Sequence, residues 1–413
     1  MQLITLKARQ ILDSRGNPTV EVEAATALHR VRALVPSGAS TGIFEAKELR
    51  DGGTSWSGKG VSKAVSNVSI IAKAVIGFDY ADQATFDAKL RELDGTSDKS
   101  KLGANAILGV SMAYSKLAAA AAGLSVYEHI AKESKNKPCL PVIYANVING
   151  GKHAGTDLKL QEFMVVPRAK NFMQAVQDIT STYHALHGII KERYGGAATG
   201  VGDEGGFAPP LKTPEEALAL LREATKAANT NMGFAIDAAA SEFYDAEKQV
   251  YTALEAMDTE AMTEYYAGLV KDFGVVSLED PFEQHAFTAF AGLRDRLIKA
   301  KPKCQVVGDD LTVTNPTRIA EAITARSADC LLLKLNQIGT VTEALEAAAT
   351  ARAAGWNVMV SHRSGETDDA YISHFAVGLG CGQIKIGAPC RGERVAKYNE
   401  LIRISERVTK YGL

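Results

Sequence analysis

Six short apolar segments in the second half of the chain each end in a polar or charged residue, and this repetition constrains the fold most strongly. Successive terminal residues are about 25–40 positions apart, the length of one strand plus one crossover helix. The terminal residues are Asp237 after 234–236, Glu279 after 275–278, Asp309 after 306–308, Lys334 after 331–333, Ser361 and His362 after 358–360, and Lys385 after 383–384.

Buried parallel strands are typically continuous apolar runs, and the functional groups of a β/α barrel gather at the carboxyl ends of its strands. The pattern therefore predicts an α/β fold with a barrel in this part of the chain. The alternative is a doubly wound open sheet with surface charges after each strand. In an open sheet, ligand groups gather near one switch point and do not follow six successive strands, so we favour the barrel.

The first part of the chain differs in character and predicts a separate α+β domain. The segment 19–23 alternates with period two, as a half-exposed strand does, and residues 59–130 are helical in character. The polar stretch 132–138 predicts a linker. Because 413 residues suffice for two or three domains, we expect an N-terminal domain over 1–134 and a barrel domain over 139–413.

Three of the strand-end residues are carboxylates: Asp237, Glu279 and Asp309. In a barrel they converge on one side of the mouth, where like charges resist ionisation unless a cation lies between them. Oxygen ligands without Cys or His suit a hard cation, most simply Mg²⁺. The alternative is that each is a solvated acid near a helix N-terminus, an explanation that fits one acid better than three in register.

Lys334 and Lys385 end later strands and are expected to face these acids across the mouth. A lysine beside a metal can act as a base if its pKa falls, or it can bind an anionic substrate as a cation. Charge alone does not decide which lysine has which role. The alternative explanation is that both lysines form structural ion pairs and have no role in a reaction.

Other segments supply groups that bind anions or approach a ligand. Arg363 and Ser364 follow a strand and offer a guanidinium fork and a hydroxyl suited to phosphate. The loops 35–42 and 149–155 are rich in small residues and equally fit linkers or lids. Glu204 lies in the glycine-rich segment 202–206, where backbone can approach a ligand, and Glu162 is a candidate supporting acid.

The composition excludes several classes of partner. The chain has 46 Lys and Arg against 48 Asp and Glu, with a net charge of −2, which argues against nucleic acid. No apolar run reaches the roughly 18 residues of a membrane span, and the first residues lack a secretory signature. The five cysteines are scattered without a CxxC pair, which indicates reduced thiols and a cytoplasmic protein.

Long motifs over nearly the whole chain resemble the enolases, the phosphopyruvate hydratases of glycolysis and gluconeogenesis. The matching segments are LDSRGNPTVEVE at 12–23, VPSGASTG at 35–42, KSKLGANAILGVSMA at 99–113, NVINGGKHAG at 146–155, QEFM at 161–164, VGDEGGFAPP at 201–210, SLEDPFE at 277–283, GDDLTVTNP at 308–316, LLLKLNQIGT at 331–340, SHRSGET at 361–367 and GQIKIGAP at 382–389.

The resemblance implies an α+β N-terminal domain, a barrel that begins ββαα with one antiparallel strand, and the lyase reaction that converts 2-phospho-D-glycerate to phosphoenolpyruvate. It implies two Mg²⁺ ions, the second arriving with substrate, and a homodimer. The implied site residues are Asp237, Glu279 and Asp309 as metal ligands, Ser40 as a ligand of the second ion and a substrate contact, Lys334 as the base at C2, Glu204 with Glu162 as the acid at C3, Lys385 at the substrate carboxylate, Arg363 and Ser364 at the phosphate, His153 and His362 lining the pocket, and Glu21 with Arg403 as the pair between subunits.

The chain departs from the enolase pattern at Ile386, beside the substrate lysine, and at Thr156, Asp157 and Lys159. None of these positions is an implied catalytic residue. Two alternatives to an active enolase remain open on the sequence: a weakened paralogue with a binding or structural role, and a superfamily enzyme acting on another carboxylate. The phosphate-binding pair Arg363 and Ser364 counts against the second alternative.

Overall fold

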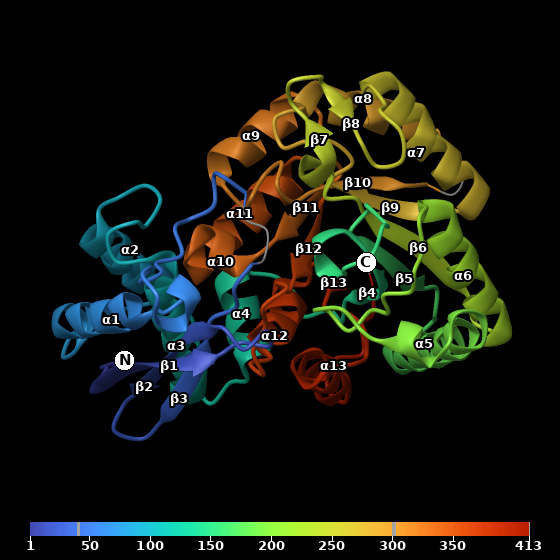
Figure 1. The fold of residues 1–413 in the computed structure, drawn as a ribbon. Helices are drawn as coiled ribbons and strands as arrows, with labels where there is room; N and C mark the ends of the chain where they lie inside the picture. The colour runs from blue at the N-terminus through green and yellow to red at the C-terminus, as the bar shows by residue number, and fades with distance from the viewer. Residues whose placement is uncertain (39–41, 300–302, 413) are drawn as a thin grey trace.

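The computed structural model describes residues 1–38, 42–299 and 303–412, and a closed barrel occupies the second part of the chain (Figure 1). The prediction of a barrel is confirmed, with the strand order β10-β11-β12-β13-β4-β5-β6-β9 around it. The barrel strands are β4 (Val142–Asn149), β5 (Glu162–Pro167), β6 (Met232–Asp237), β9 (Val275–Glu279), β10 (Gln305–Gly308), β11 (Cys330–Leu333), β12 (Asn357–Ser361) and β13 (Gly382–Lys385).

Strand β5 runs opposite to the other barrel strands. It pairs antiparallel with both β4 and β6, whereas the remaining neighbours pair in parallel. With two helices before β6, the barrel therefore begins ββαα, as the enolase resemblance implies. The helices of this part are α5 (Phe172–Tyr194), α6 (Pro214–Ala227), α7 (Thr259–Phe273), α8 (Phe287–Leu297), α9 (Pro316–Thr324), α10 (Leu335–Ile338), α11 (Val341–Ala353), α12 (Tyr371–Leu379) and α13 (Gly392–Ser405).

Short elements complete the loops of the barrel. These are η2 (Gly151–His153), η3 (Gly196–Thr199), η4 (Ala240–Phe243) and the two-stranded ribbon of β7 (Tyr244–Asp245) and β8 (Val250–Tyr251). All lie between barrel strands and leave the order of the barrel unchanged.

The N-terminal part combines a three-stranded antiparallel sheet with four helices. The elements are β1 (Thr5–Leu12), β2 (Pro18–Ala25), β3 (Arg30–Leu34), η1 (Ser55–Gly58), α1 (Ser62–Val75), α2 (Gln83–Asp94), α3 (Ala104–Ala121) and α4 (Val126–Ser134). The expectation of a half-exposed strand at 19–23 is wrong, because β2 is the central strand, contacts α3, and is buried along most of its length. Its alternating Glu21 is buried and pairs with Arg9 on the neighbouring strand.

The N-terminal part packs against the last third of the barrel. Helix α4 contacts α12, α3 contacts α10 and α2 contacts α11, as the blue and teal elements beside the orange and red ones show in Figure 1. Since α4 ends at Ser134 and β4 begins at Val142, we retain a domain boundary between residues 134 and 139 as a proposal.

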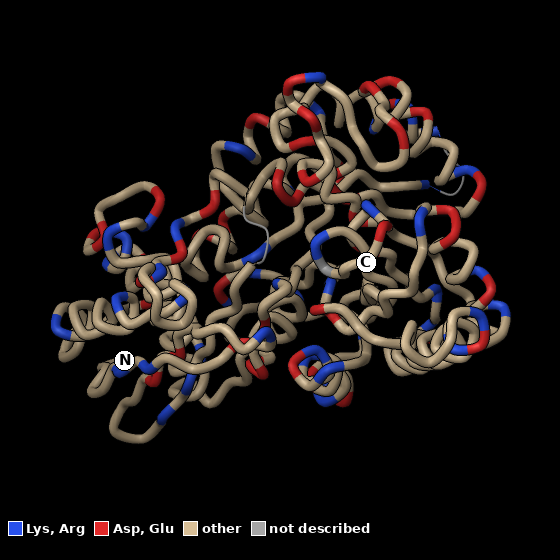
Figure 2. The backbone as a smooth tube through the Cα atoms, viewed as in Figure 1, with Lys and Arg blue, Asp and Glu red and all other residues tan. Residues whose placement is uncertain are grey.

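The surface carries both signs of charge without separation. Figure 2 shows Lys and Arg interspersed with Asp and Glu along the elements of both parts. Within the described residues, no single helix has the length and apolar composition to cross a membrane, and only α3 and α4 together meet that test, across a bend of 103°.

A partly buried ion pair joins the two parts. Lys116 on α3 places its ammonium 2.8 and 2.6 Å from the two carboxylate oxygens of Asp369, and Asp369 also accepts the backbone N–H of Leu34 at 3.0 Å. Burial raises the pKa of Asp369, but the charge and hydrogen bond of Lys116 outweigh burial and leave the pKa below its usual value.

We expect Asp369→Asn to destabilise the protein at pH 7 by roughly 1.5–3 kcal/mol, the range for a hydrogen bond to a charged group. Because the folded pKa is depressed, the stabilisation is present above the unfolded pKa of about 3.9 and is lost as the pH falls through the folded value. Calorimetry should therefore show a Tm deficit that shrinks between pH 7 and pH 3. Asp368→Asn, at the exposed neighbour, is the control, and an equal deficit at both pH values would contradict the ion-pair explanation.

Candidate active site at the barrel mouth

The strand register aligns three carboxylates in a row across neighbouring strands. Glu162 is the register partner of Asp237, and Asp237 is the partner of Glu279. Glu162 is the first residue of β5. Because β5 is antiparallel, its first residue lies at the same mouth as the last residues of β6 and β9. In-register neighbours are about 4.8 Å apart, so the three acids are adjacent and buried.

The ammonium of Lys385, at the end of β13, lies among these three carboxylates. Its Nζ atom is 2.9 Å from Asp237 Oδ2, 2.9 Å from both oxygens of Glu279 and 3.0 Å from Glu162 Oε2. Burial alone lowers the pKa of Lys385, but the acids, with Asp237 first, raise it well above its ordinary value. Lys385 is therefore a fixed positive charge within the acids rather than facing them across the mouth.

The acids remain crowded despite that lysine. Burial and the charge of Asp237 raise the pKa of Glu279 well above its ordinary value, and burial and the charge of Glu204 do the same for Glu162. Further positive charge at this row is therefore favourable. The oxygen-only donors of β6 and β9 suit a hard divalent cation, so the residues fit the Mg²⁺ expected from the sequence.

Asp309, the third predicted metal ligand, is held by a second lysine. Lys334 Nζ forms an ion pair with Asp309 Oδ2, and Gln337 Nε2 donates to Oδ1 at 2.9 Å. Burial opposes ionisation of Asp309, but the ammonium of Lys334 outweighs burial and lowers the pKa of Asp309. The same pair raises the pKa of Lys334 against the effect of burial.

Among the described residues, two groups place one ligand atom from each member within 4.8 Å of the others. They are Glu162 with Glu204 and His362, and Asp280 with Asp309 and Asp310. The predicted trio of Asp237, Glu279 and Asp309 is not one of these groups. The two lysines explain this difference, since Lys385 binds the first two acids and Lys334 binds the third.

Asp280 is a site residue to which the sequence reasoning assigned no role. Its two carboxylate oxygens accept the backbone N–H groups of Asp309 at 2.9 Å and Asp310 at 2.7 Å, so it fixes the start of the loop after β10. Asp280 is buried and has a φ of +41°, a conformation that is uncommon for a non-glycine residue. The only sequence signal was its place in the motif at 277–283, directly after Glu279.

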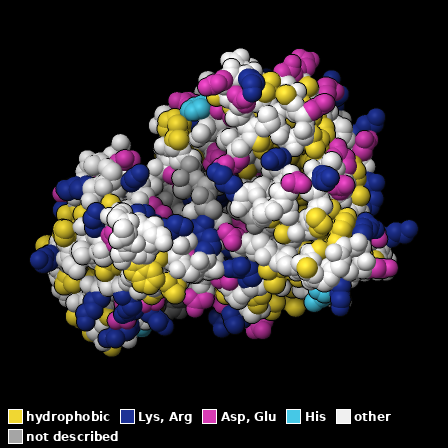
Figure 3. Space-filling view, viewed as in Figure 1, with side chains coloured by type: hydrophobic (Ala, Val, Ile, Leu, Met, Phe, Trp, Pro, Cys, Tyr) yellow, Lys and Arg dark blue, Asp and Glu magenta, His cyan; other side chains and the backbone are white. Residues whose placement is uncertain are grey.

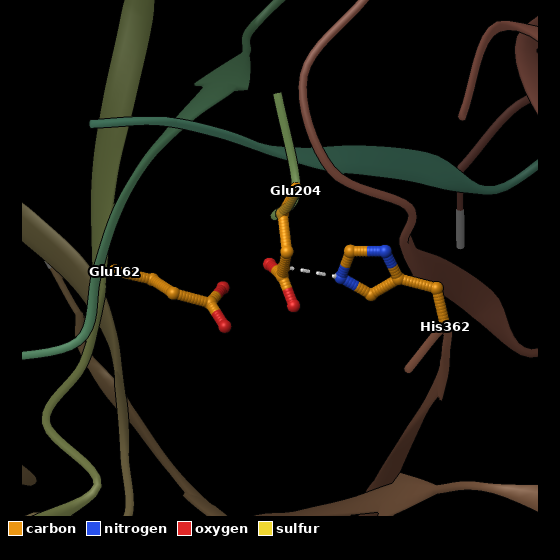
Figure 4. A group of neighbouring side chains, drawn as sticks. All are labelled: Glu162, Glu204 and His362. Atoms are coloured by element: carbon orange, nitrogen blue, oxygen red, sulfur yellow. Dashed lines mark ion pairs between the residues drawn. The ribbon is translucent and has the colours of Figure 1, made fainter. Parts of the chain in front are cut away.

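Glu204 lies between Glu162 and His362 (Figure 4). Its Oε2 atom accepts a hydrogen bond from Asn146 Nδ2 at 3.0 Å and is 3.2 Å from His362 Nε2. Burial lowers the pKa of His362 to about 4 although the charge of Glu204 opposes the shift, so the imidazole is neutral near pH 7. Glu204 and Glu162 each place a carboxylate oxygen within 4.8 Å of the other. Two carboxyl groups at this separation favour a state in which the pair keeps one proton.

The glycine-rich segment around Glu204 packs against protein rather than opening toward a ligand. A side chain at Gly206 would collide with the amide of Asn149, and the backbone of Gly205, at a φ of +83°, lies against the carbonyl of Cys390. The glycines therefore allow the loop to approach β4 closely enough to place Glu204 in the mouth.

The predicted phosphate-binding fork is formed and binds a carboxylate. Arg363 donates to both oxygens of Glu45 at 3.0 and 3.2 Å, and to Asn336 at 3.0 Å. Arg15 donates to the hydroxyl of Ser364 at 3.3 Å. Because Glu45 and Arg15 belong to the N-terminal part, both parts of the chain contribute to this side of the site.

The side chains of two predicted residues, Ser40 and His153, are not described by the structure. Ser40 lies outside the described residues, and His153 is the last residue of η2. Among the departures from the family pattern, Ile386 is fully buried, Thr156 is half-buried, and Asp157 and Lys159 are exposed.

Most of the remaining predicted residues line one cavity at the barrel mouth, although Glu279 is not among the described residues that line it. Figure 3 shows the hollow between the two parts of the molecule, with basic and acidic side chains at its edge. The lining includes Glu162, Glu204, Asp237, Asp309, Lys334, His362, Arg363, Ser364 and Lys385.

Comparisons with known proteins match nearly the whole length of the chain. Residues 3–130 match the family model of the enolase N-terminal domain, and residues 137–412 match that of the enolase C-terminal TIM barrel domain. Enolase from Thermococcus kodakarensis is 51% identical over 98% of this chain and 95% of the relative. Enolases from Mastigamoeba balamuthi (50% identical, 97% and 94% covered) and Eimeria tenella (49%, 98% and 96%) are similarly close.

We expect Asp280→Ala to lower both stability and metal affinity, because it leaves two buried N–H groups without their acceptor and releases the loop that holds Asp309. The cost is about 1–3 kcal/mol per unsatisfied donor. Thermal unfolding and calorimetric titration with Mg²⁺ measure the two effects. Asp295→Ala, at an exposed acid of α8, is the control, and wild-type Mg²⁺ affinity in the folded Asp280→Ala variant would contradict the prediction.

Proposed function

Because the chain belongs to the enolase family, whose members are hydro-lyases, we propose that it catalyses the reversible dehydration of 2-phospho-D-glycerate to phosphoenolpyruvate in glycolysis. The observation that carries the proposal is that a candidate base, Lys334, and a candidate acid, Glu204, line one cavity together with the carboxylates of Glu162, Asp237 and Asp309. A non-catalytic paralogue is not favoured, since relatives about half identical over nearly the full chain are enolases.

We propose that Lys334 removes the proton at C2 and that Glu204, assisted by Glu162, protonates the departing C3 hydroxyl. The two groups lie in different parts of the mouth: Lys334 follows β11 beside Asp309, whereas Glu204 lies beside His362 and Glu162. This separation suits an elimination in which the proton and the hydroxyl leave neighbouring carbons with the help of different groups.

The removal of a proton beside a carboxylate is difficult because it creates a doubly charged aci-carboxylate. The fixed charge of Lys385 is placed to stabilise that form more than the ground state. Two Mg²⁺ ions, which we propose are held by Asp237, Glu279, Asp309 and Ser40, would supply further positive charge and offset the Asp309 charge that holds the proton on Lys334.

Arg363 and Ser364 are proposed to bind the substrate phosphate. The fork of Arg363 already binds a carboxylate in two-pronged geometry, and a phosphate makes the same pattern of contacts. His153 and His362 are proposed to line the pocket around the substrate.

We also propose a homodimer in the cytoplasm. Within one chain Glu21 pairs with Arg9, and Arg403 pairs with Glu400 while its side chain remains exposed. The residues proposed to meet between subunits therefore do not pair with each other in one chain. All five cysteines are free, which supports a reducing compartment, and cell fractionation tests that location.

The formation of phosphoenolpyruvate from 2-phosphoglycerate should require Mg²⁺ and be measurable by ultraviolet absorbance. Lys334→Ala is expected to lower kcat by about 10²–10⁴-fold, because it removes the base. In deuterated water, Glu204→Gln should lose dehydration but still exchange the C2 proton, whereas Lys334→Ala should lose both. Lys248→Ala, at an exposed lysine, is the control, and C2 exchange at the wild-type rate in Lys334→Ala would remove Lys334 from its proposed role.

The dimer is tested by reversing one charge. Arg403→Glu should place like charges at the proposed contact with Glu21 and raise the dimer dissociation constant, measured by sedimentation equilibrium. The control is Arg407→Glu, at an exposed residue just beyond α13. A wild-type protein that sediments as a monomer at micromolar concentration would refute the proposal.

A further inference from the structure

Arg394, in the first turn of α13, is a fully buried cation at the back of the active site. Its guanidinium donates to the backbone carbonyls of two loops that carry site residues, and it also faces the ring of His362. The contacts are to Asp203 O at 3.0 Å, Arg363 O at 2.6 Å, Ser364 O at 2.5 Å and His362 Nδ1 at 2.5 Å, and the Nε atom also pairs with Glu393 Oε1 at 3.3 Å.

The chemistry of a guanidinium determines how His362 meets Arg394. A guanidinium has five N–H donors, no acceptor, and stays protonated in proteins. The Nδ1 atom of His362 must therefore present its lone pair, and a neutral imidazole then carries its hydrogen on Nε2. That atom is the one 3.2 Å from Glu204 Oε2.

We infer that Arg394 is a positioning residue for the reaction: it holds His362 in the Nε2–H tautomer, so that the ring presents a hydrogen and not a lone pair 3.2 Å from Oε2 of Glu204. Among the described residues this Nε2 atom lies beside Oε2 without the geometry of a hydrogen bond. The inference rests on the proposed role of Glu204 as the acid. The opposite tautomer would turn the Nε2 lone pair toward the carboxylate and a ring N–H toward the guanidinium, and both contacts are repulsive.

This arrangement sets the surroundings of one oxygen of Glu204. Asn146 Nδ2 donates to Oε2 at 3.0 Å, and the ring N–H of His362 lies beside the same oxygen. Both groups disfavour a proton on Oε2. Arg394 thus acts through His362 on the orientation of the acid without contacting the substrate.

A glycine at position 387 allows the backbone to lie close to Arg394, His362 and Glu204. Gly387 has a φ of +78°, and a side chain there would lie 2.7 Å from the carbonyl of Glu204, 3.1 Å from Arg394 Cδ and 3.2 Å from His362 Cε1. The hydroxyl of Tyr398, one turn along α13 from Arg394, donates to the Gly387 carbonyl at 2.6 Å.

Lys397 provides a matched control on the same helix. It is also fully buried, and its ammonium lies 2.7 Å from Glu366 Oε2 and 2.5 Å from Thr367 O. Glu366 in turn accepts the backbone N–H of Arg363 at 3.1 Å. Lys397 therefore holds the same loop as Arg394, but within the described part of the chain its ammonium pairs with Glu366 and Thr367 and not with the ring of His362.

The test is the tautomer of His362 in the full-length protein, read from the ¹⁵N–¹H spectrum of its imidazole ring and assigned with His362→Gln. We expect Nε2–H in the wild type, a shift toward Nδ1–H in Arg394→Met, and retention of Nε2–H in Lys397→Met. With 2-phosphoglycerate and Mg²⁺, Arg394→Met should lose at least about tenfold in kcat, whereas Lys397→Met should mainly raise KM through the phosphate-binding loop.

An Nδ1–H tautomer in the wild type overturns the inference, and this measurement needs no variant to fold. An unchanged tautomer in Arg394→Met overturns it as well. Because the spectrum is recorded without substrate, a wild-type protein that shows Nε2–H but no turnover would refute the proposed function while leaving the positioning of His362 established.

Discussion

The burial of several carboxylates side by side at one barrel mouth is the constraint on which the rest of the site depends. Backbone register sets Glu162, Asp237 and Glu279 at one level, and carboxylates so crowded are stable as anions only with cations among them. The later strands supply those cations, Lys385 to this row and Lys334 to Asp309. The positive charge that stabilises this row of acids is therefore also suited to binding an anionic substrate.

The N-terminal part completes the site as well as covering the barrel. It supplies Glu45 to the fork of Arg363, Arg15 to the hydroxyl of Ser364, and Lys116 to the partly buried ion pair with Asp369. The residues that receive these contacts, Arg363, Ser364 and Asp369, all lie between the end of β12 and the start of α12. Because α13 holds the same loop from the other side through Arg394, the anion-binding groups are positioned by two elements far apart in the chain.

The sequence predicted the strand-end residues well because a parallel barrel places such residues at one mouth. It did not predict how Glu162 reaches the site, since only the antiparallel direction of β5 brings the start of a strand there. Asp280 was missed because its partners are backbone N–H groups, and Arg394 because three of its partners are backbone carbonyls; backbone groups leave no signature in side-chain patterns. The alternation around Glu21 suggested an exposed face, but Arg9 on the next strand allows that glutamate to be buried.

The antiparallel β5 also has a consequence for how the chain folds. Strands β4 and β5 are neighbours in sequence and form a local hairpin-like pair, whereas the barrel closes by pairing β13 with β4, from opposite ends of the domain. Contacts between distant segments form slowly because the loop entropy must be lost first. We therefore expect Lys385 to reach Glu162 and Asp237 only when the barrel closes, so that charge neutralisation of the acidic row coincides with the last step of assembly.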